Sequence, residues 1–484
     1  ITMSAAKRKR APTKKTANKK KNQKQSDSDD FESDLSDRGE ETAPDEVLIA
    51  GHGDELDKPD KLPEELLKSL SRDGGKLLIA GQVAWEMAGK RDVKKISMSH
   101  PNLYTFHRLT DHKYRLAVSS CSAVHSVLVT EEGKVYTFGR NPFGQLGVGD
   151  TKTRDMPVEV PGLDDMFVIG AATGRHHTLF LTDTGTVYAC GDNKFGQCGV
   201  GNQAPTVTKP TRINYRGPPI VKVGCGADFS IILDVKGGLH SFGLPEFGQL
   251  GHNTEGKYFV TSNKISFHCI TSPKKVVLYI EKTKDGHVSP IDAAQIVDFS
   301  CGTNHTVAID SQKRCYSWGF GGFGRLGHAE PKDEFVPRLI KYFDTQSRGV
   351  RSVYCGGQYS LAINDLGQLF MFGQNKKTGE ANMYPKPVQD LSGWNITSIG
   401  TSNTSIMISA DDSLIAWGAS PTYGELGLGD LQKSTSTPKE VSRLEGMKIP
   451  QITMGYSHTL LLVDTKDAKT QEKYEKLPVF EVDP

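Results

Sequence analysis

A phrase of the form Gly-x-Asn-x-Phe-Gly-Gln-Leu-Gly recurs along this 484-residue chain, and its spacing constrains the fold more than any other feature. Five copies are nearly complete and two are eroded. The copies begin at Gly81, Gly139, Gly191, Gly243, Gly319, Gly373 and Gly418. The intervals between these glycines are 58, 52, 52, 76, 54 and 45 residues. Seven units of about fifty residues predict a repeat fold that closes into a ring.

A second phrase, Gly-x-x-His/aromatic-Ser/Thr followed by apolar residues, runs in phase with the first, as in CGTNHTVAID and MGYSHTLLLV. Short apolar runs such as Thr186–Cys190 alternate with polar turns that contain Gly, Asp or Asn. This alternation is typical of antiparallel hairpins. No stretch of the repeats has a long helical period, so the sequence predicts an all-β protein with one small antiparallel sheet per unit.

Seven such sheets predict a seven-bladed β-propeller, in which radial packing leaves only short, protected strand edges. The propeller is therefore expected to be monomeric. The first unit begins with the second strand of its hairpin, Lys76–Gly81, and the chain supplies a matching first strand last, Ser457–Val463. We expect these two strands to pair and close the ring. The Gln-Leu-Gly step is expected to place a leucine between neighbouring blades.

The charge of the chain, +2 overall, is strongly segregated at its N-terminal end. Residues 1–24 contain ten Lys or Arg and no acidic residue, whereas residues 26–46 contain ten Asp or Glu and a single Arg. Such a composition cannot bury a core, so residues 1–46 are predicted to be a disordered tail. The basic clusters comprise Lys7, Arg8, Lys9, Arg10, Lys14, Lys15, Lys19, Lys20 and Lys21.

The basic clusters predict nuclear localisation, contact with a DNA or RNA backbone, or both, because clustered cations displace counterions from phosphate. The alternative is a tail that only improves solubility. The acidic stretch contains Ser26, Ser28, Ser33 and Ser36, which would gain negative charge on phosphorylation. Plain disorder is the alternative there.

Nothing in the sequence predicts covalent chemistry, a metal or a cofactor. The eight cysteines show no C-x-x-C spacing. The stretch Gly319–Gly324 satisfies G-x-G-x-x-G, but the Arg-Leu-Gly of the repeat follows it rather than the helix that a dinucleotide site needs. The histidines at 125, 177, 305 and 458 share a repeat position at which another unit has Phe229, so packing or local hydrogen bonding is expected. No signal peptide or membrane span is evident, and the expected environment is intracellular and reducing.

These paired phrases, over residues 76 to about 464, resemble the regulator of chromosome condensation repeat family. Details such as IEKTKDG at Ile280–Gly286 are similar to a second paralogue within that family. The resemblance implies a seven-bladed propeller. It also implies that the founding member's activities are relevant: binding to chromatin and guanine-nucleotide exchange on the small GTPase Ran, which proceeds by stabilising the nucleotide-free GTPase. The second paralogue implies mitotic chromosomes, centromeres, the spindle midzone, microtubules and small GTPases of the Rac class.

Three functions follow from the resemblance. The first is a non-enzymatic interaction protein of mitotic chromosomes and the cytoskeleton, which binds a small GTPase and regulates cell division and migration. The second is a true exchange factor, and the third is a scaffold for chromatin or microtubules without a GTPase. The implied location is the nucleus in interphase, then chromosomes, centromere and midzone in mitosis, with some protein in the cytoplasm.

The chain departs from the founding pattern at its insertions. The founding member carries a β-wedge in its third unit, whereas here that unit has the standard 52 residues and the longest interval, 76, follows Gly243. We therefore predict one projecting hairpin within residues 253–294, with Lys282, Lys284 and Asp285 at its tip. These residues could bind a partner, or the hairpin could be a surface loop without a binding function.

A second candidate surface is the set of variable residues just before the repeated Ser/Thr, which the repeat places on one rim of the ring. The founding member uses acidic and His side chains there to face its GTPase. Here only Asp228 is acidic and His176 is the additional histidine, which makes Ran a doubtful substrate. The candidate partner-binding residues are Arg175, His176, Asp228, Asn304, Gln358 and Asn403. Ordinary solvated loops are the alternative.

The predicted domain organisation follows from these features. Residues 1–46 form the tail and residues 47–75 a linker, in which Val47–Gly51 predicts an extra outer strand and Leu62–Leu70 a short helix. Residues 76–464 form the propeller, and residues 465–484 form a charged C-terminal tail.

Overall fold

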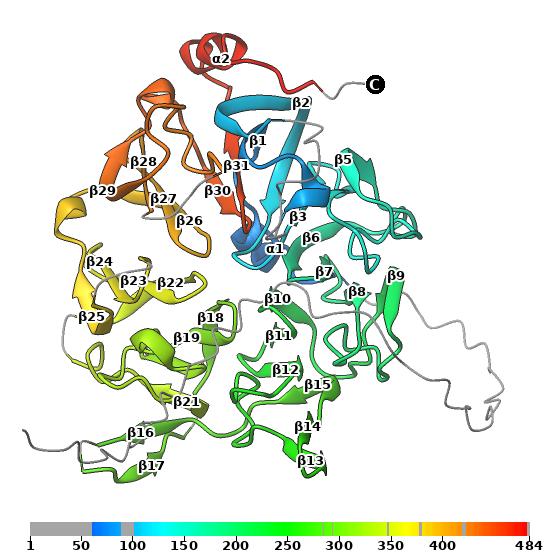
Figure 1. Ribbon diagram of the computed structural model, residues 1–484, viewed down its shortest axis with the longest axis vertical. Helices are drawn as coiled ribbons and strands as arrows, with labels where there is room; N and C mark the ends of the chain where they lie inside the picture. The colour runs from blue at the N-terminus through cyan, green and yellow to red at the C-terminus, as the bar shows by residue number, and fades with distance from the viewer. Residues whose placement is uncertain are drawn as a thin grey trace, which may run out of the picture. The chain divides into compact units, whose positions relative to one another are not determined.

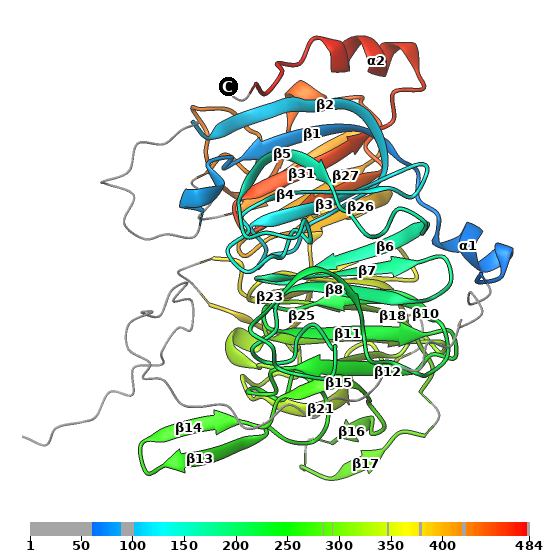
Figure 2. The same cartoon turned by 90° about the vertical axis from the view of Figure 1, so that its right-hand side faces the viewer.

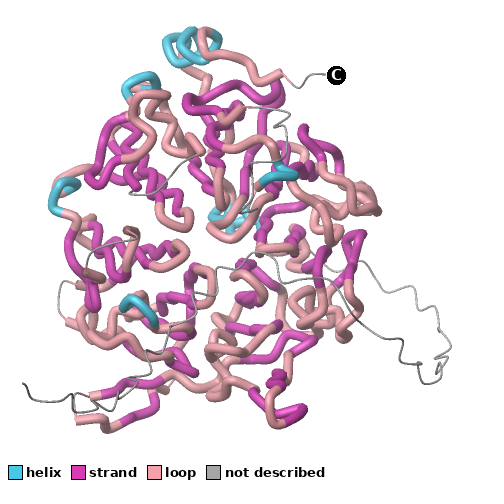
Figure 3. Tube along the Cα trace, in the orientation of Figure 1, coloured by secondary structure: helices cyan, strands magenta, loops and turns pink. Residues whose placement is uncertain are grey.

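The structure is a computed structural model that describes residues 61–88, 101–283, 285–292, 294–345, 348–376, 380–418 and 423–481. Nearly all of its regular structure is β-sheet, and helices are few (Figure 3). The basic and acidic segments and Val47–Gly51 lie outside the described residues. Within the compact unit His52–Pro484, the sheets are arranged radially around a central axis (Figure 1).

Besides the short 3₁₀ helix Trp85–Met87, the described first half of the chain forms one α-helix and the strands of the first three repeat units and of the fourth. They are α1 (Glu64–Leu70), β1 (Gly75–Gly81), β2 (Leu103–Val118), β3 (His125–Thr130), β4 (Val135–Gly139), β5 (Arg154–Glu159), β6 (Val168–Thr173), β7 (His177–Thr182), β8 (Val187–Asp192), β9 (Thr206–Arg212), β10 (Ile220–Cys225), β11 (Phe229–Asp234), β12 (Leu239–Gly243), β13 (Lys257–Thr261), β14 (Lys264–Phe267) and β15 (Ile270–Lys275).

The second half continues the pattern and ends in a helix. Its elements are β16 (Ile280–Lys282), β17 (Val288–Pro290), β18 (Ile296–Cys301), β19 (His305–Asp310), β20 (Cys315–Gly319), β21 (Glu334–Leu339), β22 (Val350–Cys355), β23 (Tyr359–Asn364), β24 (Leu369–Gly373), β25 (Asn382–Pro387), β26 (Ile396–Thr401), β27 (Ser405–Ala410), β28 (Ser413–Gly418), β29 (Thr435–Glu440), β30 (Gln451–Met454), β31 (His458–Val463) and α2 (Ala468–Glu475).

The prediction of seven separate blades is wrong. Among the described residues, four sheets have the expected four antiparallel strands, but two sheets are larger: one has six strands and one has seven, in the order β30-β31-β1-β2-β3-β4-β5. The large sheet arises because β2 is 16 residues long. The residues of β2 from Leu103 to Tyr114 pair with β1, and those from Tyr114 to Val118 pair with β3. Strand β2 therefore joins the last unit of the chain to the first complete one.

The predicted ring closure is confirmed. Strand β1 pairs antiparallel with β31 from Lys76↔Val463 to Gly81↔His458, so strands from the two ends of the repeat region lie in one sheet. Side chains add a second connection between β30 and β2. Ser119 N donates to Thr453 Oγ1 at 2.8 Å, and that hydroxyl donates back to Ser119 O at 2.9 Å.

The core lies between neighbouring sheets. The leucine of the Gln-Leu-Gly step is buried there, as predicted: Leu250 packs in a cluster with Phe299 and Trp318 of the following sheet. The leading glycines are needed for close approach. At Gly191, φ is 114°, and a Cβ atom would lie 2.2 Å from His176 O, so an L side chain would be strained and would clash.

The segments at the two ends of the propeller lie against it. Before β1, Leu62 is buried and its N–H donates to Asp183 O at 2.8 Å, while Lys61 pairs with the Asp183 carboxylate at 2.9 Å. After β31, the described part of residues 465–484, which we predicted to be a charged tail, contains helix α2. Helix α2 buries Tyr474, whose hydroxyl donates to Leu77 O at 3.3 Å. Because α2 has several charged side chains, the sequence did not indicate that Tyr474 is buried.

Candidate partner-binding surface

The Gly-x-x-His loops and the glycine loops lie at the same end of the sheets, and we call this end the rim. The register explains why: His177 at the start of β7 is opposite Gly191 near the end of β8, and Phe229 is likewise opposite Gly243. Neighbouring loops are also joined directly, since Arg175 N donates to Ala227 O at 3.0 Å and Ala227 N to Thr303 O at 2.8 Å. The loops that precede β7, β11 and β19 are therefore linked along the rim.

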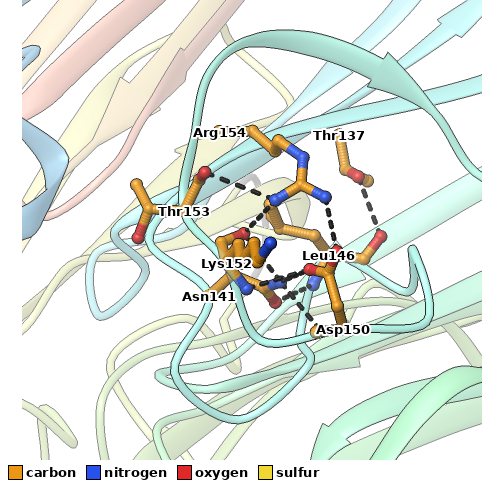
Figure 4. A network of polar contacts seen from close by, with 7 residues as sticks. All are labelled: Thr137, Asn141, Leu146, Asp150, Lys152, Thr153 and Arg154. Carbon is orange, nitrogen blue, oxygen red and sulfur yellow. Dashed lines mark hydrogen bonds and ion pairs between the residues drawn. The ribbon is translucent and has the colours of Figure 1, made fainter.

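The repeated asparagine stabilises the glycine loops that contain it, as Figure 4 shows for Asn141. Its Nδ2 donates to Asp150 O and Lys152 O, both at 3.0 Å, and its Oδ1 accepts from Leu146 N at 3.0 Å. Arg154 then pairs with the Asp150 carboxylate at 2.7 Å. One side chain thus satisfies three backbone groups, which fixes the loop without regular secondary structure.

The structure brings two predicted rim residues together. Arg175 Nη2 lies 3.7 Å from Asp228 Oδ2, across the boundary between two sheets, and both side chains are largely buried. Their side chains belong to consecutive loops of the rim. Because 3.7 Å exceeds a hydrogen-bond distance, this ion pair is attractive but loosely constrained.

His176 lies beside this pair and is half-buried. Its ring centroid is 4.7 Å from that of Phe143 in the neighbouring glycine loop. Burial, and then the charge of Arg175, lower the pKa of His176 well below its usual value. The imidazole is therefore neutral at pH 7 and contributes shape and a weak polar contact rather than positive charge.

Two further carboxyl groups accompany Asp228, and the sequence reasoning missed both. Burial, and then repulsion by Asp228, raise the pKa of Glu246. Burial also raises the pKa of Asp192, whose carboxylate lies 3.7 Å from Lys194 Nζ. Lys257 lies near enough to Glu246 to favour its ionised form. We call Arg175, Asp192, Lys194, Asp228, Glu246 and Lys257 the charged sector of the rim.

The remaining predicted rim residues do not join the charged sector. Asn304 and Gln358 occupy equivalent positions in two other sheets, Asn403 lies one position earlier in the loop of a third, and all three are half-buried. Two of them serve the loops through their carbonyls: Asn304 O accepts from Phe320 N at 2.8 Å and Gln358 O from Gln374 N at 2.9 Å. These three neutral residues therefore add no charge to the rim, whereas Arg175 and Asp228 do.

The predicted insertion contains two hairpins rather than one. The Asp-Gly hairpin consists of β16 and β17, with Asp285 exposed in its turn, while Lys284 lies outside the described residues. This hairpin is tied to the propeller: Ile280 bridges to Arg338 of β21, and Lys282 Nζ lies 3.9 Å from Glu334 Oε1. The Lys282 side chain therefore has a structural partner.

The other hairpin, β13–β14, is the one that projects freely, and the sequence reasoning did not single it out. It connects Gly243 to Ile270, which pair at the rim end of their sheet, so it extends from the rim itself (Figure 2). All five residues of β13 are exposed. Two short runs with aromatic and β-branched residues, KYFVT and KISF, flank a polar turn, and this is the signal that could have identified it.

The recurring histidines have structural roles, as predicted. His125, His177, His305 and His458 are fully buried, and the Nε2 atoms of all four lie within 2.9 Å of a serine or threonine hydroxyl in a neighbouring unit. The described residues contain no group of three or more His, Cys, Asp or Glu that could hold a metal ion. Nor does any described helix have the length and apolar character to cross a membrane.

Comparison with known proteins agrees with this architecture. Residues 75–461 match the family described as RCC1-like domain. The chain is 48% identical over 429 residues to "Protein RCC2 homolog" of Danio rerio, covering 87% of each chain. It is 46% identical over 433 residues to "Protein RCC2" of Homo sapiens, covering 88% of this chain and 83% of that one. A structure of Prp20p from Saccharomyces cerevisiae, described with its binding to Gsp1p and histones, covers 86% of this chain and is covered over 98% of its own length, with a TM-score of 0.64 and 17% identity.

Proposed function

The chain belongs to the RCC1-like domain family, and on that premise we propose that it is a non-enzymatic interaction protein of chromosomes whose rim binds a small GTPase. The observation that carries the proposal is the charged sector, in which Asp228 and Glu246 repel each other while Arg175 only loosely neutralises them. Arg175 and Lys257 lie near these two partly desolvated carboxyl groups, but burial and repulsion by Asp228 still raise the Glu246 pKa, which favours the approach of a further cation. A lysine or arginine of the partner would relieve the repulsion between the two carboxylates.

The partner class follows from the relatives. Prp20p is described as binding Gsp1p and histones, and the fold of this chain is similar to it. The substitution of most rim residues by neutral side chains, such as Asn304 and Gln358, favours a GTPase other than Ran. We propose a member of the Rac class.

Chromosome association is the second part of the proposal. The relatives named RCC2 and the basic clusters at the N-terminal end of the sequence favour a nuclear protein that moves to chromosomes, centromere and midzone in mitosis. Phosphate backbones attract such clusters electrostatically. Microtubules are also anionic polymers, so they would attract the same clusters.

Guanine-nucleotide exchange is the other candidate function. It is favoured by the β13–β14 hairpin, which projects from the rim and could enter a GTPase as the partner docks on the charged sector. Exchange needs no covalent step, only tighter binding to the nucleotide-free GTPase than to the loaded form.

A binding experiment on charge reversals tests the proposal. The affinities of the intact chain for Rac-class GTPases are measured in the nucleotide-free, GDP-bound and GTP-analogue-bound states, together with release of a fluorescent nucleotide. Asp228→Lys is expected to weaken binding at least tenfold. Asp365→Lys is the matched control, because Asp365 pairs with Lys313 at 2.9 Å in turns at the opposite end of the sheets.

Equal affinities of wild type and Asp228→Lys would contradict a GTPase site in the charged sector. Accelerated nucleotide release would identify an exchange factor, and binding without acceleration would identify an adaptor. The absence of binding to any GTPase would leave the scaffold function.

A further inference from the structure

The β13–β14 hairpin is a two-stranded sheet whose outer edges have no strand neighbour among the described residues. Its strands pair antiparallel through Lys257↔Phe267, Tyr258↔Ser266 and Phe259↔Ile265. Each strand therefore has one edge of backbone N–H and C=O groups that no other strand covers. Natural proteins usually protect such edges, because they readily pair with another chain.

One face of this hairpin is apolar. Residues opposite each other in an antiparallel pair share a face, as do alternate residues along a strand. Phe259, Ile265 and Phe267 therefore form an apolar stripe on the same face as Lys257. Phe259 is 68% exposed and Ile265 is 44% exposed, so this stripe is open to solvent. On the other face, Tyr258 stacks on His268 with ring centroids 4.3 Å apart, which supports the base of the hairpin.

The charge of the segment has a single sign. Residues 256–280 contain Lys257, Lys264, Lys274 and Lys275 and no Asp or Glu. Lys257 faces Glu246 at the base of the hairpin, whereas Lys264 lies beside the turn at the far end. An approaching segment therefore meets positive charge and exposed aromatic surface together.

From this combination we propose that the hairpin receives an extended acidic segment of a protein partner as a third antiparallel or parallel strand. Main-chain hydrogen bonds along the open edge would supply affinity, and the lysines with the apolar stripe would select acidic residues alternating with apolar ones. A third strand would also stabilise the hairpin, since an isolated two-stranded sheet is only marginally stable in water. The proposal does not depend on whether the partner is a GTPase.

A lipid surface is the competing occupant for an apolar, cationic hairpin, and the turn argues against it. Thr261, Ser262 and Asn263 form the tip, and all are polar. A hairpin that inserts into a membrane would carry its apolar side chains at the tip, where they would reach the acyl chains first. Here they lie along the flank, where a strand would dock.

The second hairpin of the insertion serves as an internal comparison. Strand β16 is bridged to β21, and Glu281 is paired with Lys341, so this hairpin is attached to the propeller at its side. By contrast, β13–β14 is attached through its two ends, where His268 N donates to Gly256 O at 2.8 Å. Neither strand of β13–β14, unlike β16, pairs with a strand of the propeller among the described residues, and Phe259 and Ile265 are exposed on one face.

The test is selection of peptides from a random displayed library on the intact chain, followed by synthesis of the enriched peptides. The expected peptides alternate Asp or Glu with β-branched residues, and they bind the chain in a salt-dependent manner. Lys257→Glu with Lys264→Glu is expected to weaken their binding at least tenfold, whereas Lys236→Glu, in an exposed turn at the opposite end of the sheets, leaves it unchanged. All three substituted positions are outside the core, and an unchanged melting temperature verifies the fold.

Peptides N-methylated at alternate residues separate strand pairing from simple charge attraction, because they keep every side chain and lose backbone donors. Loss of binding on the methylated edge supports the proposal. Equal binding of methylated and unmethylated peptides would overturn it, and so would a selection that enriches no acidic sequence. Binding of phosphatidylserine vesicles that is lost in Phe259→Ser would overturn it in favour of a lipid surface.

Discussion

His177 Nε2 lies 2.9 Å from Ser230 Oγ, across the boundary between the sheet of β7 and the sheet of β11. Ser230 Oγ donates its hydrogen to Gln197 O at 2.8 Å, so the histidine must be the donor in the first bond. The same two-step connection joins His125 to Thr178 and Gln145 O, at 2.8 and 2.7 Å. The recurring histidine is therefore a hydrogen-bonded connection between neighbouring sheets.

Replacing His177 separates its packing from its hydrogen bond. His177→Phe keeps the volume, and the neighbouring unit already accommodates Phe229 at this position, so a loss of about 1 kcal/mol in the free energy of unfolding is expected. His177→Ala adds a cavity and should cost about 3 kcal/mol. Urea unfolding at neutral pH measures both values, and equal losses would mean that the ring contributes no packing.

Because these histidines are buried and neutral, we predict that the free energy of unfolding decreases in acid. Burial lowers the pKa of His177 to about 4 and those of His125 and His458 to about 3, against 6.5 in the unfolded chain. Between these values the unfolded state binds more protons, so stability is fully present above about pH 6.5 and falls as the pH drops towards 4. The slope is about 1.4 kcal/mol per pH unit for each histidine. His177→Phe should show a shallower dependence, and identical slopes would contradict a neutral buried imidazole.

Glu425 predicts the opposite trend on the alkaline side. It occupies the position of Gln145, and its Oε2 accepts from Tyr423 N at 3.1 Å just as Gln145 Oε1 accepts from Phe143 N at 3.0 Å. Burial raises the pKa of Glu425 to about 7, above 4.5 in the unfolded chain, so its stabilising protonated form is lost as the pH rises through 7.

Glu425→Gln should therefore change stability little near pH 4 and increase it by up to about 3 kcal/mol above pH 7. The reciprocal variant Gln249→Glu, at the equivalent position of another unit, should lose stability above pH 7. Thermal unfolding at both pH values checks the pair, and a stabilisation that does not depend on pH would refute the assignment.

The glycine loop of Figure 4 predicts the effect of a minimal change. Asn141→Asp keeps the acceptor for Leu146 N but removes the donors to Asp150 O and Lys152 O, and it adds a charge near Asp150. A loss of about 2 kcal/mol is expected. Hydrogen exchange should show faster exchange in residues 141–154, and exchange that remains as slow as in wild type would show that the loop does not need these bonds.

The sequence was sufficient for those parts of the fold that repeat. The glycines needed for positive φ, such as Gly191, and the buried leucines, such as Leu250, recur in register, so each copy supports the interpretation of the others. Ring closure could be predicted because β1 and β31 are complementary halves of one repeat.

The features that the sequence did not predict each occur once and are not shared between the repeat units. Strand β2 joins two units because it continues through Arg108 to Thr110, where other units turn. Tyr474 reaches its buried position from a helix that is otherwise charged. The charged sector depends on Asp228 and Glu246, which lie in different loops of one unit. They approach Arg175 only across a sheet boundary, and an alignment of the repeats does not show which residues are close across that boundary.

The most direct test of the account is the affinity of the intact chain for Rac-class GTPases in each nucleotide state, compared between wild type, Asp228→Lys and Asp365→Lys. We predict measurable binding that Asp228→Lys weakens at least tenfold and Asp365→Lys leaves unchanged. Binding that is equally strong in all three proteins would contradict the charged sector as the GTPase-binding surface, and no binding in any state would contradict the proposed function itself.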